Sequence, residues 1–192
     1  LWSSGTSRGS GGGSTQLTMF NGFWVNAAAI SNGPAQFRGT YVGTIRTNGS
    51  SQAAWVHGGT ASGGTAAILG FWNAYNRVRV TGRDPDSTSS WSYGSTSFRS
   101  ANNSTGMRVS WVNGFDYDSI RVAYMTLAVA AAGKANAAIG LDSTSSASSN
   151  CLIATGGTSN SFALTSELHD TSLGFHFAQA LERAQDGVSV DF

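Results

Sequence analysis

Hydrophobic and polar residues alternate along this chain in short runs, which are separated by clusters of glycine, serine and asparagine. A period of two places successive side chains on opposite faces of a strand, so each run predicts a strand with one buried face. About nine or ten such runs follow one another, with turn signals roughly every dozen residues. This spacing predicts an all-β fold, an antiparallel β-sandwich with jelly-roll-like connections.

The clearest local signal is a hairpin. Leu17–Phe20 and Phe23–Val25 are apolar runs joined by Asn21-Gly22, and Asn-Gly between two such runs is a strong signal for a two-residue turn. Arg38–Thr47 alternates in the same way and stops at the turn signal Asn48-Gly49. The sequence therefore predicts a hairpin followed by a further strand.

The densest aromatic run is Phe71–Val80. Its alternation predicts one strand across the whole run, with Trp72 and Val78 on a buried face. A helix is the alternative, because aromatic and apolar residues also stand four apart there. The Arg-Val-Arg-Val ending has no helical stripe, and this favours the strand.

Two later segments carry the longest apolar patterns. Ile120–Ala132 is apolar at most positions on both faces, which predicts a central strand covered on both sides. Phe175–Ala184 fits a strand and a helix equally well, and both interpretations stay open.

The chain divides into one short segment and one domain. Residues 1–15 are mostly glycine, serine and threonine, which predicts a flexible amino-terminal segment that becomes ordered only against the body or a neighbouring subunit. The length of 192 residues allows one core of ordinary size, so we expect a single β-sandwich domain over residues 16–192.

The charge balance argues against two classes of partner. Charged residues make up only 11% of the chain, the formal net charge is +1, and there is no basic run. A nucleic-acid-binding protein usually carries a basic patch, so we expect no nucleic acid as a partner. The longest apolar run, Val122–Ala132, is far shorter than the roughly 20 residues that span a bilayer, so we expect no membrane insertion.

No motif predicts catalysis, a metal or a cofactor, and we expect a non-enzymatic protein. Gly5-Thr6-Ser7-Arg8-Gly9 has the letters of a nucleophile elbow, but it lacks the strand and helix that such a turn requires. Asp84-Pro85-Asp86 and Asp116-Tyr117-Asp118 could each hold a hard cation, although turn capping explains them better. The three histidines lack the spacing of a metal site on one element.

Three aromatic residues are candidate glycan contacts, namely Trp55, Trp91 and Tyr93. An aromatic ring at a polar surface offers a flat apolar face to a sugar ring. The alternative is that these side chains fill the core of the sandwich.

Several stretches, taken in order, resemble structural proteins of tailed bacteriophages, a group of tail-fibre-like and head-decoration-like proteins. The matching stretches are Gly39–Thr47, Phe71–Val78 with its Trp-Asn-Ala-Tyr-Asn-Arg-Val motif, Trp91–Tyr93, Arg99–Asn102, Ala138–Thr144 and Gly174–Phe177. The resemblance covers most of residues 38 to 184.

This resemblance implies framework roles for the residues of the central motif. Trp72 and Tyr75 would be core and interface aromatics, and Asn73 and Asn76 would bond to backbone groups. Arg77 would bond to a neighbouring carbonyl or acid.

It also implies a function, that of a virion structural protein on the particle surface, as a fibre or decoration subunit of the tail or head. Its partners would be other virion proteins and a host-surface glycan. Virion appendages are symmetric oligomers, so we expect a homotrimer. Two alternatives stay open: a capsid cement protein that laces capsomers with its amino-terminal segment, and a secreted carbohydrate-binding module that binds sugar through Trp55, Trp91 or Tyr93.

Overall fold

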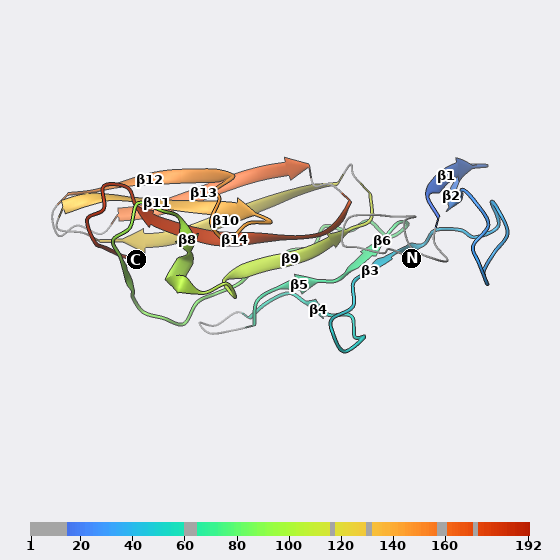
Figure 1. Cartoon of the computed structure of the whole chain (residues 1–192), viewed down its shortest axis with the longest axis horizontal. Coiled ribbons are helices and arrows are strands. Elements are labelled where there is room, and N and C mark those ends of the chain that lie inside the picture. Colours follow the sequence, from blue (N-terminus) through green and yellow to red (C-terminus); the bar gives the residue numbers. More distant parts are fainter. Residues whose placement is uncertain (1–14, 60–64, 116–117, 130–131, 157–160, 171–172) are drawn as a thin grey trace.

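The computed structural model describes residues 15–59, 65–115, 118–129, 132–156, 161–170 and 173–192, and its regular structure is nearly all β-strand (Figure 1). The helical element in these ranges is one 3-10 turn, η1, at Ala101–Asn103. The predicted all-β sandwich is confirmed, while its jelly-roll connectivity stays a prediction. Residues 1–14, with most of the predicted flexible segment and the Gly5–Gly9 motif, lie outside the described ranges.

The main sheet is built around β14 (Gly174–Ala184), which pairs with β11 (Ala132–Leu141) on one side and with β9 (Arg108–Asn113) on the other. Buried residues occupy both faces of β14, as expected for a central strand. The short strand β8 (Arg99–Ser100) continues the β9 side of β14 and places Arg99 opposite Glu182. The residues of Phe175–Ala184 therefore form a strand, which decides between the two open interpretations.

The outer strands of this sheet lie at its two edges. β12 (Ser149–Gly156) pairs with β11 at one edge. At the other edge, β5 (Ile68–Leu69) pairs with β9 in the parallel sense, and β4 (Trp55–Val56) pairs with β5. The β4 edge is where the aromatic pocket described below is formed.

A second layer is formed by β10 (Ser119–Ala128) and β13 (Ser161–Asp170), which pair over ten residues. The side chains of β10 alternate between exposed and partly or fully buried positions. Its inward side chains pack on the main sheet, and they include Ile120, Val122 and Tyr124. The core between the layers is rich in alanine, with Ala128, Ala135, Ala137 and Ala184 fully buried, and side chains of this size let the two layers approach closely.

The prediction of a strand over Ile120–Ala132 that is covered on both sides is wrong. β10 ends at Ala128, and its outer face is open, with Met125 exposed. The strand belongs to the outer layer, where only one of its faces packs on the main sheet. The hydrophobicity of the residues on its outer face therefore did not indicate that they are buried.

The prediction of one strand over Phe71–Val80 is also wrong in its extent. β6 covers only Phe71–Asn73, and Val78 is 66% exposed. The physical reason lies in Asn73, whose side-chain oxygen accepts the backbone N–H groups of Tyr75 and Asn76 at 2.9 and 3.0 Å. An asparagine bonded in this way to the following backbone turns the chain and ends the strand.

The amino-terminal part of the described chain carries two small sheets. The predicted hairpin is confirmed: β1 (Leu17–Phe20) pairs with β2 (Phe23–Asn26) across Asn21 and Gly22, whose φ angles are 49° and 82°. Positive φ at both central residues is what a type I′ turn requires. β3 (Gly43–Ile45) pairs with β6, and Figure 1 shows the hairpin at one end of the long axis of the molecule.

The carboxyl-terminal residues complete the alanine-rich core. β15 (Val190–Asp191) pairs with β7 (Ser92–Tyr93), and Val190 and Phe192 pack against the alanine-rich core. This pairing holds Trp91 next to β14, where it meets Glu182.

Candidate functional site

The central motif is anchored by Asp118, just before β10. The Nε1–H of Trp72 donates a hydrogen bond to Oδ2 of Asp118 at 2.5 Å, and Arg77 forms an ion pair with Oδ1 of the same carboxylate. The Arg77 guanidinium also lies 4.9 Å from the Trp72 ring centroid, within the range of a cation–π contact. One carboxylate thus fixes β6 and the loop that follows it against the second layer.

The ring of Trp72 belongs to an aromatic cluster made of Trp24, Tyr41, Trp72 and Phe115. Phe115 packs edge-on against Trp72, with ring centroids 4.8 Å apart, and it also contacts Tyr41 and Trp24. Pairs of this geometry contribute about 0.5–1.5 kcal/mol each beyond the area that they bury. The cluster therefore joins the hairpin, the β3–β6 pair and the end of β9 into one unit.

The other motif residues lie at the surface. Asn73 accepts backbone N–H groups through its side-chain oxygen, whereas Asn76 is exposed and donates its own backbone N–H to Asn73. Tyr75 is exposed, which leaves its ring accessible to a partner.

The three candidate glycan contacts occupy different environments. Trp91 packs against the core and donates its Nε1–H to Glu182. Tyr93 also packs against the core, its hydroxyl donates to the carbonyl of Ser97 at 3.0 Å, and the Arg99 guanidinium covers its ring at 3.8 Å. Only Trp55 of the three is strongly exposed, at 40%, so it alone has an open face for a ligand.

Glu182 is a buried acid that the sequence analysis did not single out. Its side chain is fully buried in β14, and its carboxylate accepts hydrogen bonds from Trp91 and from Arg99, the latter at 2.8 Å. Burial raises the pKa of Glu182 above its ordinary value, although the hydrogen bonds from Trp91 and Arg99 and the charge of Arg99 act in the opposite direction.

This raised pKa predicts a pH dependence of stability. The folded state holds the Glu182 proton more tightly than the unfolded state does, so its contribution is fully present below the unfolded pKa, near 4.5, and is lost as pH rises through the folded pKa. Glu182→Gln does not titrate at this position. From about pH 4 to pH 7 the wild type should therefore lose free energy of unfolding relative to Glu182→Gln, measured by urea denaturation. A difference that stays flat, or that moves in favour of the wild type, would contradict it.

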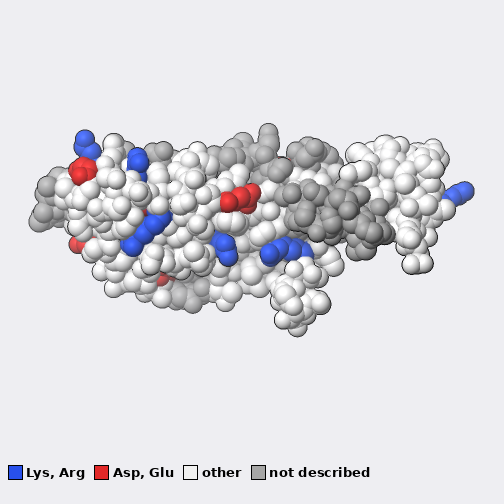
Figure 2. Space-filling model, in the orientation of Figure 1, with Lys and Arg blue, Asp and Glu red and all other residues white. Residues whose placement is uncertain are grey.

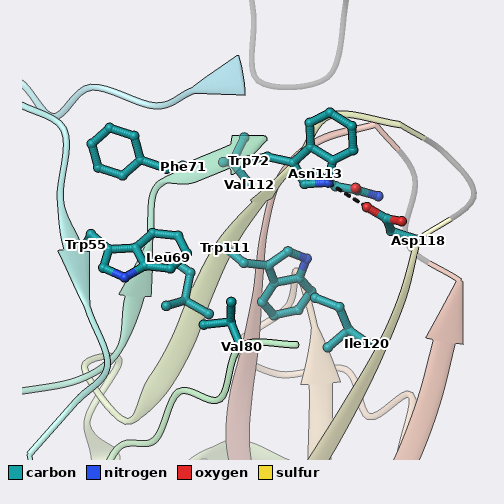
Figure 3. Close-up of a pocket in the computed structure, with 10 residues that line it drawn as sticks. All are labelled: Trp55, Leu69, Phe71, Trp72, Val80, Trp111, Val112, Asn113, Asp118 and Ile120. Atoms are coloured by element: carbon teal, nitrogen blue, oxygen red, sulfur yellow. Dashed lines mark hydrogen bonds between the residues drawn. The ribbon is translucent and has the colours of Figure 1, made fainter. Parts of the chain in front are cut away.

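A hollow of about 140 Å³ opens between the β4 edge of the main sheet and the start of β10. We call it the aromatic pocket. Figure 3 labels all ten residues that line it, and those used below are Trp55, Leu69, Phe71, Val80, Trp111 and Asp118. Trp55 and Phe71 form its outer side, and their rings meet edge-on with centroids 6.0 Å apart.

Trp111 forms the deep side of the aromatic pocket. It comes from β9, is only 4% exposed, and packs with Ile120 and Leu69. Its Nε1 atom is buried and has no hydrogen-bond partner among the residues that the structure describes. In Figure 3 this nitrogen lies on the side of the ring toward Asp118 and Ile120. A buried N–H without a partner is uncommon, and leaving one unsatisfied costs about 1–3 kcal/mol.

The orientation of Trp55 is fixed by His57. The Nε1–H of Trp55 donates to Nε2 of His57 at 3.0 Å, so that nitrogen acts as the acceptor and Nδ1 carries the proton. Nδ1 then donates to the carbonyl of Thr81 at 2.9 Å. This chain of bonds holds the indole of Trp55 on the edge strand, with one face turned to the pocket.

Asp118 and Trp111 were not identified as a pair from the sequence. The sequence pattern favours turn capping for Asp118, and around Trp111 it indicates no more than a short alternating strand, Arg108–Val112. Both line the aromatic pocket because residues of β10 pack on the Trp111 cluster across the sandwich, and the local pattern contains no information on that arrangement.

Within the described ranges, no group of three or more histidine, cysteine, aspartate or glutamate side chains could hold a metal ion, and no helix there is long and apolar enough to cross a membrane. No protein-family model, no curated protein and no solved structure matches this chain. The resemblance to phage proteins therefore stays a prediction.

Proposed function

We propose that this chain is a non-enzymatic structural subunit of a bacteriophage virion, a surface fibre or decoration subunit that works as a homotrimer. The role of an assembly subunit is inferred from one observation: the amino-terminal half of the chain exposes many large apolar side chains. The motifs that resemble those of tailed-phage proteins support the choice of a virion as the assembly.

Large exposed apolar side chains are concentrated in residues 15–80. Ten of the twelve found in the described residues lie there: Met19, Phe20, Phe23, Phe37, Val42, Ile45, Trp55, Phe71, Tyr75 and Val78. Single exposed apolar residues are normal, but a concentration of them in one part of a protein is typical of a contact surface.

The charge distribution supports the assignment of this surface as an interface. Residues 1–83 contain six arginines and no acidic residue, whereas all ten acidic residues follow from Asp84 onward. In the view of Figure 2 the end that carries the hairpin is mostly uncharged, with one basic side chain at its tip. Interface cores are depleted of charge, and a closed symmetric oligomer would cover the hairpin end of this surface.

The trimer can be tested with surface substitutions. Phe23→Ser and Ile45→Ser together should convert the trimer to monomers, because a hydroxyl replaces apolar contact area at the proposed interface. The measurement is the mass in solution, expected at three times the chain mass of 19.9 kDa for the wild type. Met125→Ser is the control, because Met125 is 64% exposed, close to the 62% of Ile45, but belongs to β10. A monomeric wild type, or equal dissociation by the control, would refute the trimer.

The virion role has a separate test. Mass spectrometry of purified particles of the phage that encodes this chain should find it in stoichiometric amounts. Purified particles that lack the chain would exclude the proposal, whatever its oligomeric state.

A further inference from the structure

We propose that the aromatic pocket binds the ring of a neutral sugar. The inference goes beyond the structural role proposed above, and the two can fail independently, because sugar binding is measured on the isolated chain. It rests on the size of the pocket, on its aromatic walls, on the unsatisfied donor at its deep side and on the absence of cations from its lining.

The size of the pocket limits the occupant to about one ring. Its volume of about 140 Å³ lies below the roughly 300–1,000 Å³ of pockets that enclose drug-sized ligands. A single six-membered ring fits such a hollow, and a longer chain would have to extend out past Trp55 and Phe71.

The walls favour a ring with an apolar face. Trp55 and Phe71 are 40% and 43% exposed, and both line the pocket. Leu69 and Val80 add to its apolar surface. The C–H face of a pyranose ring packs on aromatic rings of this kind, and the indole of Trp55 is already held in place by His57.

The deep side favours a ring that also carries hydroxyl groups. The buried Nε1–H of Trp111 is a donor that has no acceptor among the described residues. Asp118, which also lines the pocket and already binds Trp72 and Arg77, is an acceptor. A hydroxyl both donates and accepts, so the hydroxyls of one sugar can bond to both groups. A purely apolar ligand would leave the Trp111 N–H unsatisfied.

The charges argue against an anion. Asp118 is the one charged residue among the ten that line the pocket, and no lysine or arginine is among them. Arg77, which lies outside the lining, already pairs with Asp118, and the lining supplies no cation of its own to bind a phosphate or carboxylate group. The lining therefore favours an uncharged sugar over acidic sugars and the phosphates of a nucleic acid.

The test is an NMR titration of the isolated chain with methyl β-glucoside, methyl β-galactoside and N-acetylglucosamine, following the indole N–H signals. A ligand of this size, at ordinary efficiency per atom, should bind with a dissociation constant on the order of 1 mM. The signals of Trp55 and Trp111 should shift in a saturable manner with at least one sugar. The signal of Trp24, which lies in the aromatic cluster outside the pocket lining, should shift far less.

Variants then separate the pocket from the rest of the surface. Trp55→Ala should weaken binding about 10-fold or more, because it removes one wall. Trp111→Phe keeps a ring but loses the N–H, and should weaken binding by a similar factor. Phe23→Ala is the control, because Phe23 is an exposed aromatic residue on the hairpin and not part of the pocket. Circular dichroism checks that each variant is folded, and the Trp55 variant alone decides the question if Trp111→Phe does not fold.

Several results would overturn the inference. They are the absence of any saturable shift with the three sugars, equal weakening by Phe23→Ala, unchanged binding by a folded Trp55→Ala variant, and tighter binding of adenosine or of a proline-rich peptide to the same indoles. The last result would assign the pocket to a different class of ligand.

Discussion

Replacing Glu182 with alanine is expected to lower the free energy of unfolding by about 3 kcal/mol. Glu182 is fully buried, and it accepts hydrogen bonds from Trp91 and from Arg99. Alanine would leave the guanidinium and the indole N–H without this acceptor. The remaining partner of a broken buried pair stays desolvated, and this usually costs about 3–5 kcal/mol. We expect the lower end, because a quarter of the Arg99 side chain is exposed and can be hydrated.

The measurement is urea denaturation of both proteins at pH 7. Glu182→Gln is the matched variant, because the amide keeps the size of the side chain and an oxygen acceptor, and it should cost clearly less than alanine. Asp186→Ala is the control for loss of an acid near the end of the chain. Asp186 is exposed, and the hydrogen bond that it accepts from the Val188 N–H is long, at 3.3 Å, so its loss should cost under about 1 kcal/mol. Equal effects of Ala and Gln at position 182 would show that the hydrogen bonds are unimportant.

The features that the sequence predicted correctly are those with local causes. Asn21-Gly22 determines the hairpin through the backbone of two residues, and both adopt the positive φ that the turn requires. The all-β class follows in the same way from short alternating runs and frequent turns. In each case the residues that decide the structure are neighbours in the chain.

The end of β6 also has a local cause, but the alternating pattern of residues did not reveal it. The alternation of Phe71–Val80 continues past Asn73, but the Asn73 side chain bonds to the next backbone N–H groups and ends the strand. Alternation indicates where side chains would point in a strand. It does not indicate whether a polar side chain forms hydrogen bonds with the backbone and so ends the strand.

The site could not be predicted, because its residues meet over long separations in the chain. Trp72 and Asp118 are 46 residues apart, and Trp91 and Glu182 are 91 apart. Their contacts depend on which strands pair and in which register, and a single sequence does not determine either. Trp91 illustrates this, because its sequence leaves both a surface contact and a core position open, and the bond to Glu182 decides between them.

Gly114→Ala is expected to destabilise the protein by about 3 kcal/mol, at the upper end of the usual cost of overpacking. A Cβ atom at Gly114 would lie 2.1 Å from Cε3 of Trp72 and 2.5 Å from Cδ2, so the ring or the backbone has to move. The ring has little freedom to do so. Phe115 packs against it at 4.8 Å and Tyr41 lies at 6.0 Å, while its Nε1–H is bonded to Asp118. Any shift therefore disturbs the aromatic cluster and the Asp118 anchor together.

Gly49→Ala provides the matched control, since a Cβ at Gly49 meets no atom within 4 Å and its φ is not among the positive ones. There alanine only reduces the freedom of the unfolded chain, and it should be neutral or stabilise by up to about 1 kcal/mol. Urea denaturation measures both variants, and the near-ultraviolet circular dichroism of the tryptophans should change for Gly114→Ala alone. Equal stability of the two variants would mean that Trp72 can leave its position without cost. The aromatic cluster would then not be what holds the hairpin to the sandwich.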